Sequence, residues 1–246
     1  MKKLLLGAIA LTAVAGSAQA ADLAARTYTK APPIVAPIYN WTGFYIGIEG
    51  GGSWGRSKHT DQRTGLDDSP SFDVNGGLVG GTVGYNWQAS NWVFGLEGDW
   101  SWSGQRGSSI DTGPMGNPAF ASTTRENWLA TVRGRVGYAV NNVLLYGTGG
   151  YAAAEVRADL RTTGANTVID TATTTRSGWT AGAGVEWGFA PNWSAKVEYL
   201  YVGLEDKPFT TVNAGPGFNR SAVTLNDNIV RAGVNYRFGG PIVAKY

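Results

Sequence analysis

The chain has 246 residues, ten tryptophans, no cysteine and a formal net charge of +2 at pH 7. The lack of cysteine excludes disulfides and thiolate metal sites. The near balance of 20 basic and 18 acidic residues argues against nucleic acid as a partner.

Residues 1–20 have the pattern of a secretory signal peptide. Lys2 and Lys3 precede an apolar run, residues 4–15, and a small-residue cleavage site ends at Ala20. The run is too short to span a bilayer as a helix, which needs roughly 20 apolar residues. We therefore expect export, cleavage near Ala20 and a formally neutral mature chain.

Residues 21–40 are rich in alanine and proline. Proline is excluded from helix interiors and from the ladders of central strands, so this segment is expected to be an extended tether. Residues 239–246 are expected to be a short C-terminal extension.

Eight segments then alternate large apolar residues with small or polar ones. In one of them Trp92, Leu96 and Trp100 share one parity, while Glu97 and Asp99 share the other. A period of two is typical of a strand with two unlike faces. The segments are about 41–54, 77–87, 92–102, 128–139, 143–153, 178–189, 193–202 and 229–238.

Large aromatic residues stand near the ends of these segments, with small aliphatic residues between them. This is the girdle-and-band pattern of strands that cross a lipid bilayer. The aromatic residues expected at the membrane interfaces are Trp41, Trp54, Trp87, Trp92, Trp100, Trp102, Trp128, Trp179, Trp187, Trp193 and Phe238.

The connections between segments alternate in length. Residues 88–91, 140–142 and 190–192 are short and rich in asparagine, whereas 55–76, 103–127, 154–177 and 203–228 are long and polar. Short turns on one rim and long loops on the other predict an all-β fold over residues 41–238: an eight-stranded antiparallel transmembrane up-and-down β-barrel with periplasmic turns and four extracellular loops. An even number of strands places the tether, residues 21–40, on the periplasmic side. A soluble β-sandwich is the alternative, but it does not need exposed aromatic residues at nearly every strand end.

The opposite parity carries five acids and five bases, which the barrel would enclose. Eight closed strands leave an interior about wide enough for side chains. We expect these charges to pair and plug the lumen; an ion pathway is the alternative. The interior set is Glu49, Glu97, Asp99, Arg133, Arg135, Glu186, Lys196, Glu198, Arg231 and Arg237. The expected pairs join Glu97 and Asp99 to Arg133 and Arg135, Glu186 to Lys196, and Glu49 to Arg231 or Arg237.

The only histidine, His59, falls in the first expected loop. A lone loop histidine is expected to be a solvated surface residue; haem ligation is the alternative, and no catalytic or metal site is expected. Basic residues of the expected loops, Arg106, Arg125 and Arg161 among them, could touch lipopolysaccharide phosphates. The equally frequent acids in these loops favour ordinary solvated surfaces.

Five stretches carry a resemblance: residues 40–47, 84–87, 91–99, 133–138 and 231–238. Through them the chain resembles the small outer-membrane β-barrel family of Gram-negative bacteria that includes the RopB-type and haemin-binding surface proteins, distantly similar to the OmpA membrane domain. The resemblance implies a surface antigen of the envelope, without enzymatic activity and sometimes credited with haem binding. It also implies that Phe238 or Tyr246 acts as the barrel-insertion signal.

We therefore expect a non-enzymatic, monomeric outer-membrane barrel that contributes to envelope structure and surface display. Its expected partners are outer-membrane lipid, lipopolysaccharide and the barrel-insertion machinery, and no resident cofactor is expected. The alternatives are a narrow, porin-like diffusion pore, and the binding of haem or a host ligand through the loops.

Overall fold

The computed structural model describes residues 39–61, 65–67, 69–114, 117–208 and 221–239. The expected signal peptide, residues 21–38 of the expected tether and residues 240–246 lie outside this part. The described residues contain no helix that is long and apolar enough to cross a membrane. Their strands are β1 (Gly43–Asp61), β2 (Phe72–Ala89), β3 (Trp92–Ser103), β4 (Arg106–Ile110), β5 (Phe120–Val140), β6 (Val143–Thr162), β7 (Val168–Ala190), β8 (Trp193–Pro208) and β9 (Ser221–Arg237).

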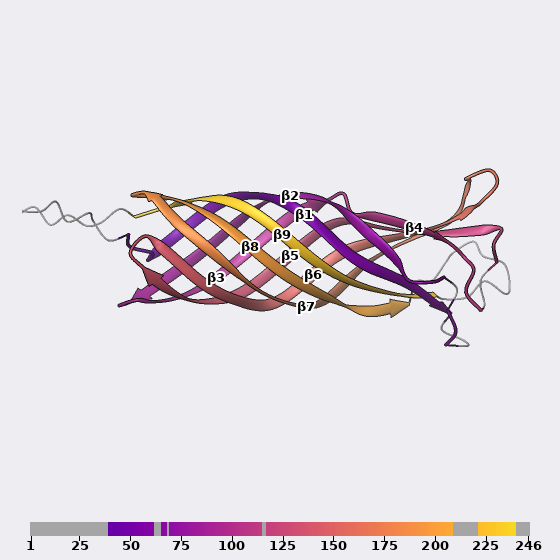
Figure 1. Ribbon diagram of the computed structural model, residues 1–246, viewed down its shortest axis with the longest axis horizontal. Coiled ribbons are helices and arrows are strands. Elements are labelled where there is room, and N and C mark those ends of the chain that lie inside the picture. The colour runs from indigo at the N-terminus through magenta and orange to yellow at the C-terminus, as the bar shows by residue number, and fades with distance from the viewer. Residues whose placement is uncertain (1–38, 62–64, 68, 115–116, 209–220, 240–246) are drawn as a thin grey trace, which may run out of the picture. The chain divides into compact units, whose positions relative to one another are not determined.

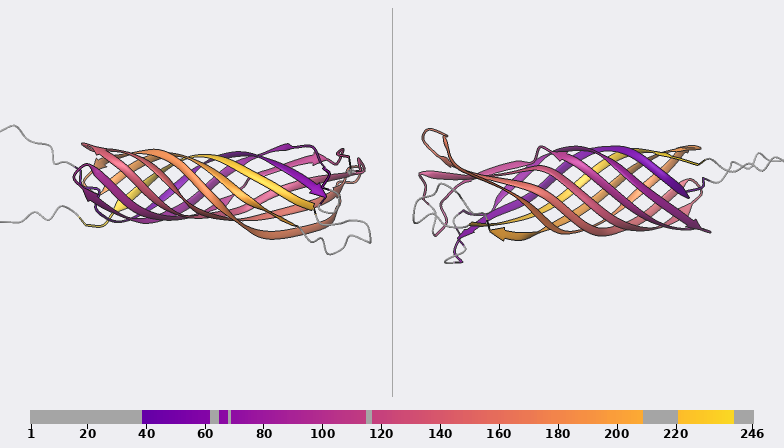
Figure 2. Two further views of the ribbon diagram at one scale, coloured as in Figure 1. Left: turned by 90° about the horizontal axis from the view of Figure 1, so that it is seen from below. Right: turned by 180° about the vertical axis from the view of Figure 1, so that it is seen from behind.

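The strands close into a ring of eight. Each long strand pairs antiparallel with its neighbours, and β1 pairs with both β2 and β9. The short strand β4 follows β3 after Gly104 and Gln105. It takes the place of β3 beside β5, with which it pairs antiparallel. Figures 1 and 2 show the tilted strands winding around the closed barrel. The predicted eight-stranded antiparallel barrel is confirmed.

The three short turns repeat one hydrogen-bonding device. In each turn the backbone carbonyl of an asparagine accepts from the N–H of a residue on the next strand around the barrel, while the asparagine side-chain amide donates to the carbonyl of that same residue. These bonds tie each turn to the neighbouring strand at this rim. The asparagine–partner pairs are Asn91 with Ala139, Asn142 with Gly188, and Asn192 with Arg237.

The strands run much further into the expected loops than the sequence pattern indicated. β1 continues to Asp61, β5 begins at Phe120, β6 continues to Thr162 and β7 begins at Val168. Most of the expected loops 55–76, 103–127 and 154–177 is therefore strand. These extensions lack the apolar alternation because no lipid faces them, so their backbone pairing leaves little trace in hydropathy.

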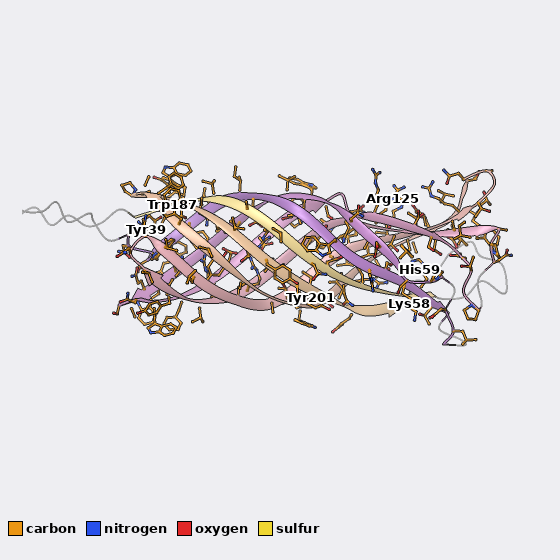
Figure 3. All side chains as sticks on the ribbon, in the orientation of Figure 1. Tyr39, Lys58, His59, Arg125, Trp187 and Tyr201 are labelled. Atoms are coloured by element: carbon orange, nitrogen blue, oxygen red, sulfur yellow. The ribbon has the colours of Figure 1, made fainter. Side chains whose placement is uncertain are left out.

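The outer wall carries a continuous apolar surface between two aromatic bands. Val132 and Val197, in the middle of this surface, are 64% and 58% exposed. Trp187 lies in the band near the short turns, and Tyr201 lies further along the barrel (Figure 3). An exposed apolar belt of this extent is stable only against hydrocarbon. We take the segments between the bands as membrane-spanning. The exposed tryptophans are Trp54, Trp87, Trp92, Trp100, Trp102, Trp179, Trp187 and Trp193.

The remaining expected interface residues, Trp41, Trp128 and Phe238, lie in three different environments. The expectation for Trp41 is wrong: it is 1% exposed. Trp41 precedes β1 and therefore does not follow its alternation; its ring packs against Tyr39, with centroids 4.5 Å apart. Trp128 is half-buried beside Trp102, its partner across β3 and β5. Phe238 is 49% exposed at the end of β9.

An arginine at the centre of the apolar belt should be costly. We expect Val132→Arg and Val197→Arg each to lower the free energy of unfolding by about 2–4 kcal/mol, because the guanidinium would face hydrocarbon. The measurement is urea titration of the folded protein in lipid vesicles. Ile110→Arg is the matched control, because Ile110 is also exposed, at 51%, but lies on β4 beyond the belt. Equal effects at all three positions would contradict the assigned membrane region.

Candidate functional site

Nine charged side chains meet inside the membrane-spanning part of the barrel. Arg133 makes three ion pairs: Nη2 lies 2.5 Å from Glu97 Oε1 and 2.9 Å from Asp99 Oδ2, and Nη1 lies 2.9 Å from Glu198 Oε1. Each of these side chains is at most 2% exposed. One guanidinium thus joins carboxylates from β3 and β8 across the lumen.

Arg231 and Lys196 extend this network toward β1. Arg231 pairs with Glu49, and its guanidinium lies 3.0 Å from Asp99 Oδ1 and 2.8 Å from Glu198 Oε2. Lys196 Nζ lies 3.1 Å from Glu49 Oε2. Each of these carboxylates contacts two or more cations, so its charge is compensated within the barrel.

Glu186 does not pair with Lys196 as expected, although the two residues are directly opposed across β7 and β8. Its Oε2 accepts a 2.7 Å hydrogen bond from Arg135 Nη2 instead, while Lys196 Nζ lies 3.2 Å from Glu97 Oε1. In so narrow a barrel, a long side chain reaches partners across the lumen as readily as its neighbour on the next strand. Strand register alone therefore gave the wrong partner.

Arg237 does not reach Glu49. Its guanidinium donates to the carbonyls of Thr42, at 3.2 Å, and Pro191, at 2.8 Å, at the short-turn rim. Arg237 therefore stabilises the short-turn rim. Of the two partners expected for Glu49, Arg231 and Arg237, only Arg231 contacts this carboxylate.

Tyrosines and a glycine complete the packing around Arg135. The guanidinium carbon lies 4.0 Å from the centroid of the Tyr146 ring, and Tyr45 donates a 2.7 Å hydrogen bond to Glu97. Gly95 also faces the lumen here; a Cβ on it would lie 2.9 Å from Arg135 Cγ. Glycine thus leaves space for the arginine stem.

Apolar side chains close the lumen on both sides of the network. Toward the short turns lies a cluster of Tyr39, Trp41, Val93, Ala139, Leu144 and Tyr146. Toward the loops lies a larger cluster of Phe72, Val74, Leu78, Leu129, Ala152, Ala154, Val156, Leu200, Val202, Leu204, Leu225 and Ile229. Neither cluster is predicted by the alternation of the sequence. Their only signal is a large apolar residue on the otherwise polar parity, such as Leu129 or Leu200.

His59 lies inside the barrel on β1, contrary to its expected place in a surface loop. It is 5% exposed, its Nε2 lies 3.0 Å from Thr124 Oγ1, and its ring packs against Phe72. Burial and the nearby charge of Arg176 lower the pKa of His59 to about 4. The imidazole is therefore neutral at pH 7. Figure 3 shows His59 beyond Tyr201, toward the loop end.

A second buried polar group lies just beyond the membrane-spanning part. Gln105 Nε2 donates a 2.6 Å hydrogen bond to Asp227 Oδ1, and Glu126 interacts with the same carboxyl. Burial raises the pKa of Asp227 to about 6. Burial and the nearby charge of Asp227 raise the pKa of Glu126 well above its usual range. Within the described residues, no cluster of three or more histidine or acidic side chains could hold a metal ion.

Residues 6–238 match the family model of the outer membrane protein beta-barrel domain. The chain belongs to this outer-membrane barrel family. It is 39% identical to the 31 kDa outer-membrane immunogenic protein of Brucella melitensis, over 97% of this chain and all of that protein. It is also 32% identical to the 22 kDa outer membrane protein of Rhizobium leguminosarum bv. viciae, over 83% of this chain and 81% of that protein. The predicted family and the Gram-negative outer-membrane location are confirmed.

Among solved structures, the outer membrane protease OmpT from Escherichia coli matches with a TM-score of 0.51 and 14% identity. The match covers 81% of this chain and 98% of that chain. At this identity the similarity concerns the barrel fold of the family, and the protease activity is a property of OmpT.

Removing one cation from the network should destabilise the barrel strongly. We expect Arg133→Gln to cost about 3–5 kcal/mol, because three buried carboxylates lose a partner. Arg56→Gln is the control: Arg56 and Asp73 form an ion pair whose side chains are 80% and 79% exposed, and loss of such a pair costs less than about 1 kcal/mol. Urea titration in vesicles compares the two variants with the wild type. Equal losses would show that the interior pairs contribute no more than surface pairs.

The lowered pKa of His59 makes stability depend on pH. The unfolded chain protonates this histidine near pH 6.5 and the folded chain only near 4, so the stability that neutral His59 contributes is lost as pH falls between these values. From pH 7 to 4 the wild type should lose about 3 kcal/mol more than His59→Gln. Urea titrations at both pH values measure this difference. The raised pKa of Asp227 acts in the opposite direction but is common to both proteins; identical pH profiles would contradict the burial of His59.

Proposed function

We propose that this family member is a closed, non-enzymatic barrel that contributes to envelope structure and displays its loop end at the cell surface. The observation that carries the proposal is the filled lumen. A paired-charge network lies between two apolar clusters, and its side chains are at most 4% exposed.

The same packing argues against a diffusion pore. An ion passing through the network would have to separate arginine–carboxylate contacts of 2.5–2.9 Å. Uncompensated buried charges cost several kcal/mol each, since neither water nor another partner replaces the lost contact. A permeating ion would also have to cross the apolar cluster that contains Leu129, Leu200 and Ile229.

The interior also offers little for catalysis or for haem ligation. His59 is buried and hydrogen-bonded to Thr124, so in this conformation its ring nitrogen is not presented at the surface. The carboxylates of the network already contact cations. The Brucella relatives are named outer-membrane immunogenic proteins, which supports a role in surface display.

We also propose that the protein is a monomer surrounded by outer-membrane lipid and lipopolysaccharide. Phe238, rather than Tyr246, is our candidate for the residue that the barrel-insertion machinery reads. Its N–H donates to the Phe44 carbonyl at 2.8 Å, so it sits at the end of the closing strand with its ring exposed. Tyr246 lies outside the described residues.

Planar-bilayer recording tests the closed lumen. We expect no steady single-channel conductance from the inserted wild-type protein, because the network and both apolar clusters block the lumen. A general porin in the same bilayers is the positive control, and the change in gel mobility on boiling verifies that the barrel is folded. Steady conductance steps would contradict the proposal and favour the pore.

A further inference from the structure

Four arginines gather on the outer wall at the loop end of the barrel. Arg106, Arg125 and Arg157 occupy directly opposed positions on the adjacent strands β4, β5 and β6. Arg161 lies four residues further along β6. We call these four residues the arginine wall. Directly opposed like charges destabilise a sheet, so this arrangement requires a source of negative charge.

The chain supplies one such charge in Asp159. Arg157 Nε donates to its Oδ1 at 2.8 Å, while Arg125 Nε and Arg161 Nη2 lie 3.9 and 3.8 Å from Oδ2. Thr171 donates to the same carboxylate. The Asp159 side chain is 1% exposed, so it lies beneath the guanidiniums. One buried carboxylate orients the arginines but cannot neutralise all four.

The arginine wall therefore keeps uncompensated charge at the surface. The side chains of Arg125 and Arg157 are 41% exposed, while the Nε atoms of Arg125 and Arg161 are buried and have no hydrogen-bond acceptor among the described residues. The neighbouring acid on β6, Glu155, accepts a 2.8 Å hydrogen bond from Asn127. Even counting Glu155 with Asp159, the four arginines leave a formal charge of +2.

The height of the arginine wall matches the membrane surface. Toward the membrane, the next pair of outward-facing residues after Arg125 and Arg157 is Trp128 and Glu155. At about 3.4 Å per residue, the arginines lie roughly 7 Å beyond Trp128, where lipid headgroups begin. Figure 3 likewise places Arg125 beyond Tyr201, away from Trp187.

We propose that the arginine wall binds a phosphate group of an outer-leaflet glycolipid. The planar guanidinium fork matches phosphate oxygens in geometry and charge. Below Trp128 the opposed outward residues are Ala130 and Ala153, and such small side chains leave space for an acyl chain against the wall. This site rests on the proposed lipopolysaccharide surroundings of the barrel but is independent of the closed lumen, because it lies on the outer surface.

The test is a titration of the folded, detergent-solubilised protein with two glycolipids, a bisphosphorylated diglucosamine lipid and its dephosphorylated form, followed by tryptophan fluorescence. We expect the wild type to bind the phosphorylated form about tenfold more tightly, which corresponds to roughly 1.4 kcal/mol. Arg125→Gln/Arg157→Gln should lose this preference. Arg56→Gln should keep it, because Arg56 also lies just beyond the outer aromatic band, on β1, but is not part of the arginine wall and pairs with Asp73.

Two further arms identify the source of the phosphate. Inorganic phosphate and a heparin oligosaccharide are titrated under the same conditions, and both should bind more weakly than the phosphorylated glycolipid. Equal binding of either would overturn the assignment to a glycolipid, in favour of a generic anion or a sulfated glycan. Equal affinity of the wild type for the two glycolipids, or a double variant that keeps the preference, would overturn the site itself. If the double variant does not fold, the wild-type comparison alone decides.

Discussion

Closure of the strand ring is the constraint from which the other features follow. Hydrocarbon offers no hydrogen-bonding partner to a backbone amide, so no strand edge can remain open within the bilayer. The hydrogen-bonded ladder between β1 and β9 removes the last edge. In this ladder Gly51 lies directly opposite Arg231. A ring of only eight strands brings opposite walls within reach of one arginine or lysine side chain. The narrow bore therefore forces charges from distant parts of the sequence into contact.

These contacts explain why the interior is shut. Charges withdrawn from water are tolerated when several partners share them, as Arg133 and Arg231 do with the carboxylates of β1, β3 and β8. The apolar clusters on either side keep water from competing for these pairs. The lumen thus has the layered packing of a protein core, while the apolar outer wall faces the lipid. The barrel extends beyond the bilayer, where its wall carries polar and basic side chains instead.

The sequence was sufficient for the fold and for the identities of most inward charges, because a period of two distinguishes two faces wherever one of them meets lipid. It was insufficient where that contrast disappears. The polar strand extensions of β1, β5, β6 and β7 resembled loops, and the misread extension of β1 misplaced His59. Trp41 resembled an interface residue because position in the chain does not reveal that it folds into the lumen. The pairing of Lys196 depended on distances across the barrel, which strand register does not contain.

Water access to the lumen tests the central claim most directly. The natural chain has no cysteine, so a single Ser101→Cys substitution reports on a side chain that is fully buried between β2 and β5. Ile110→Cys, on the exposed outer wall, is the reference for unhindered reaction. A closed lumen predicts that a charged, water-soluble thiol reagent modifies the cysteine at position 110 promptly, but modifies that at position 101 only after the barrel is unfolded. Reaction at similar rates in the folded protein would contradict a closed lumen.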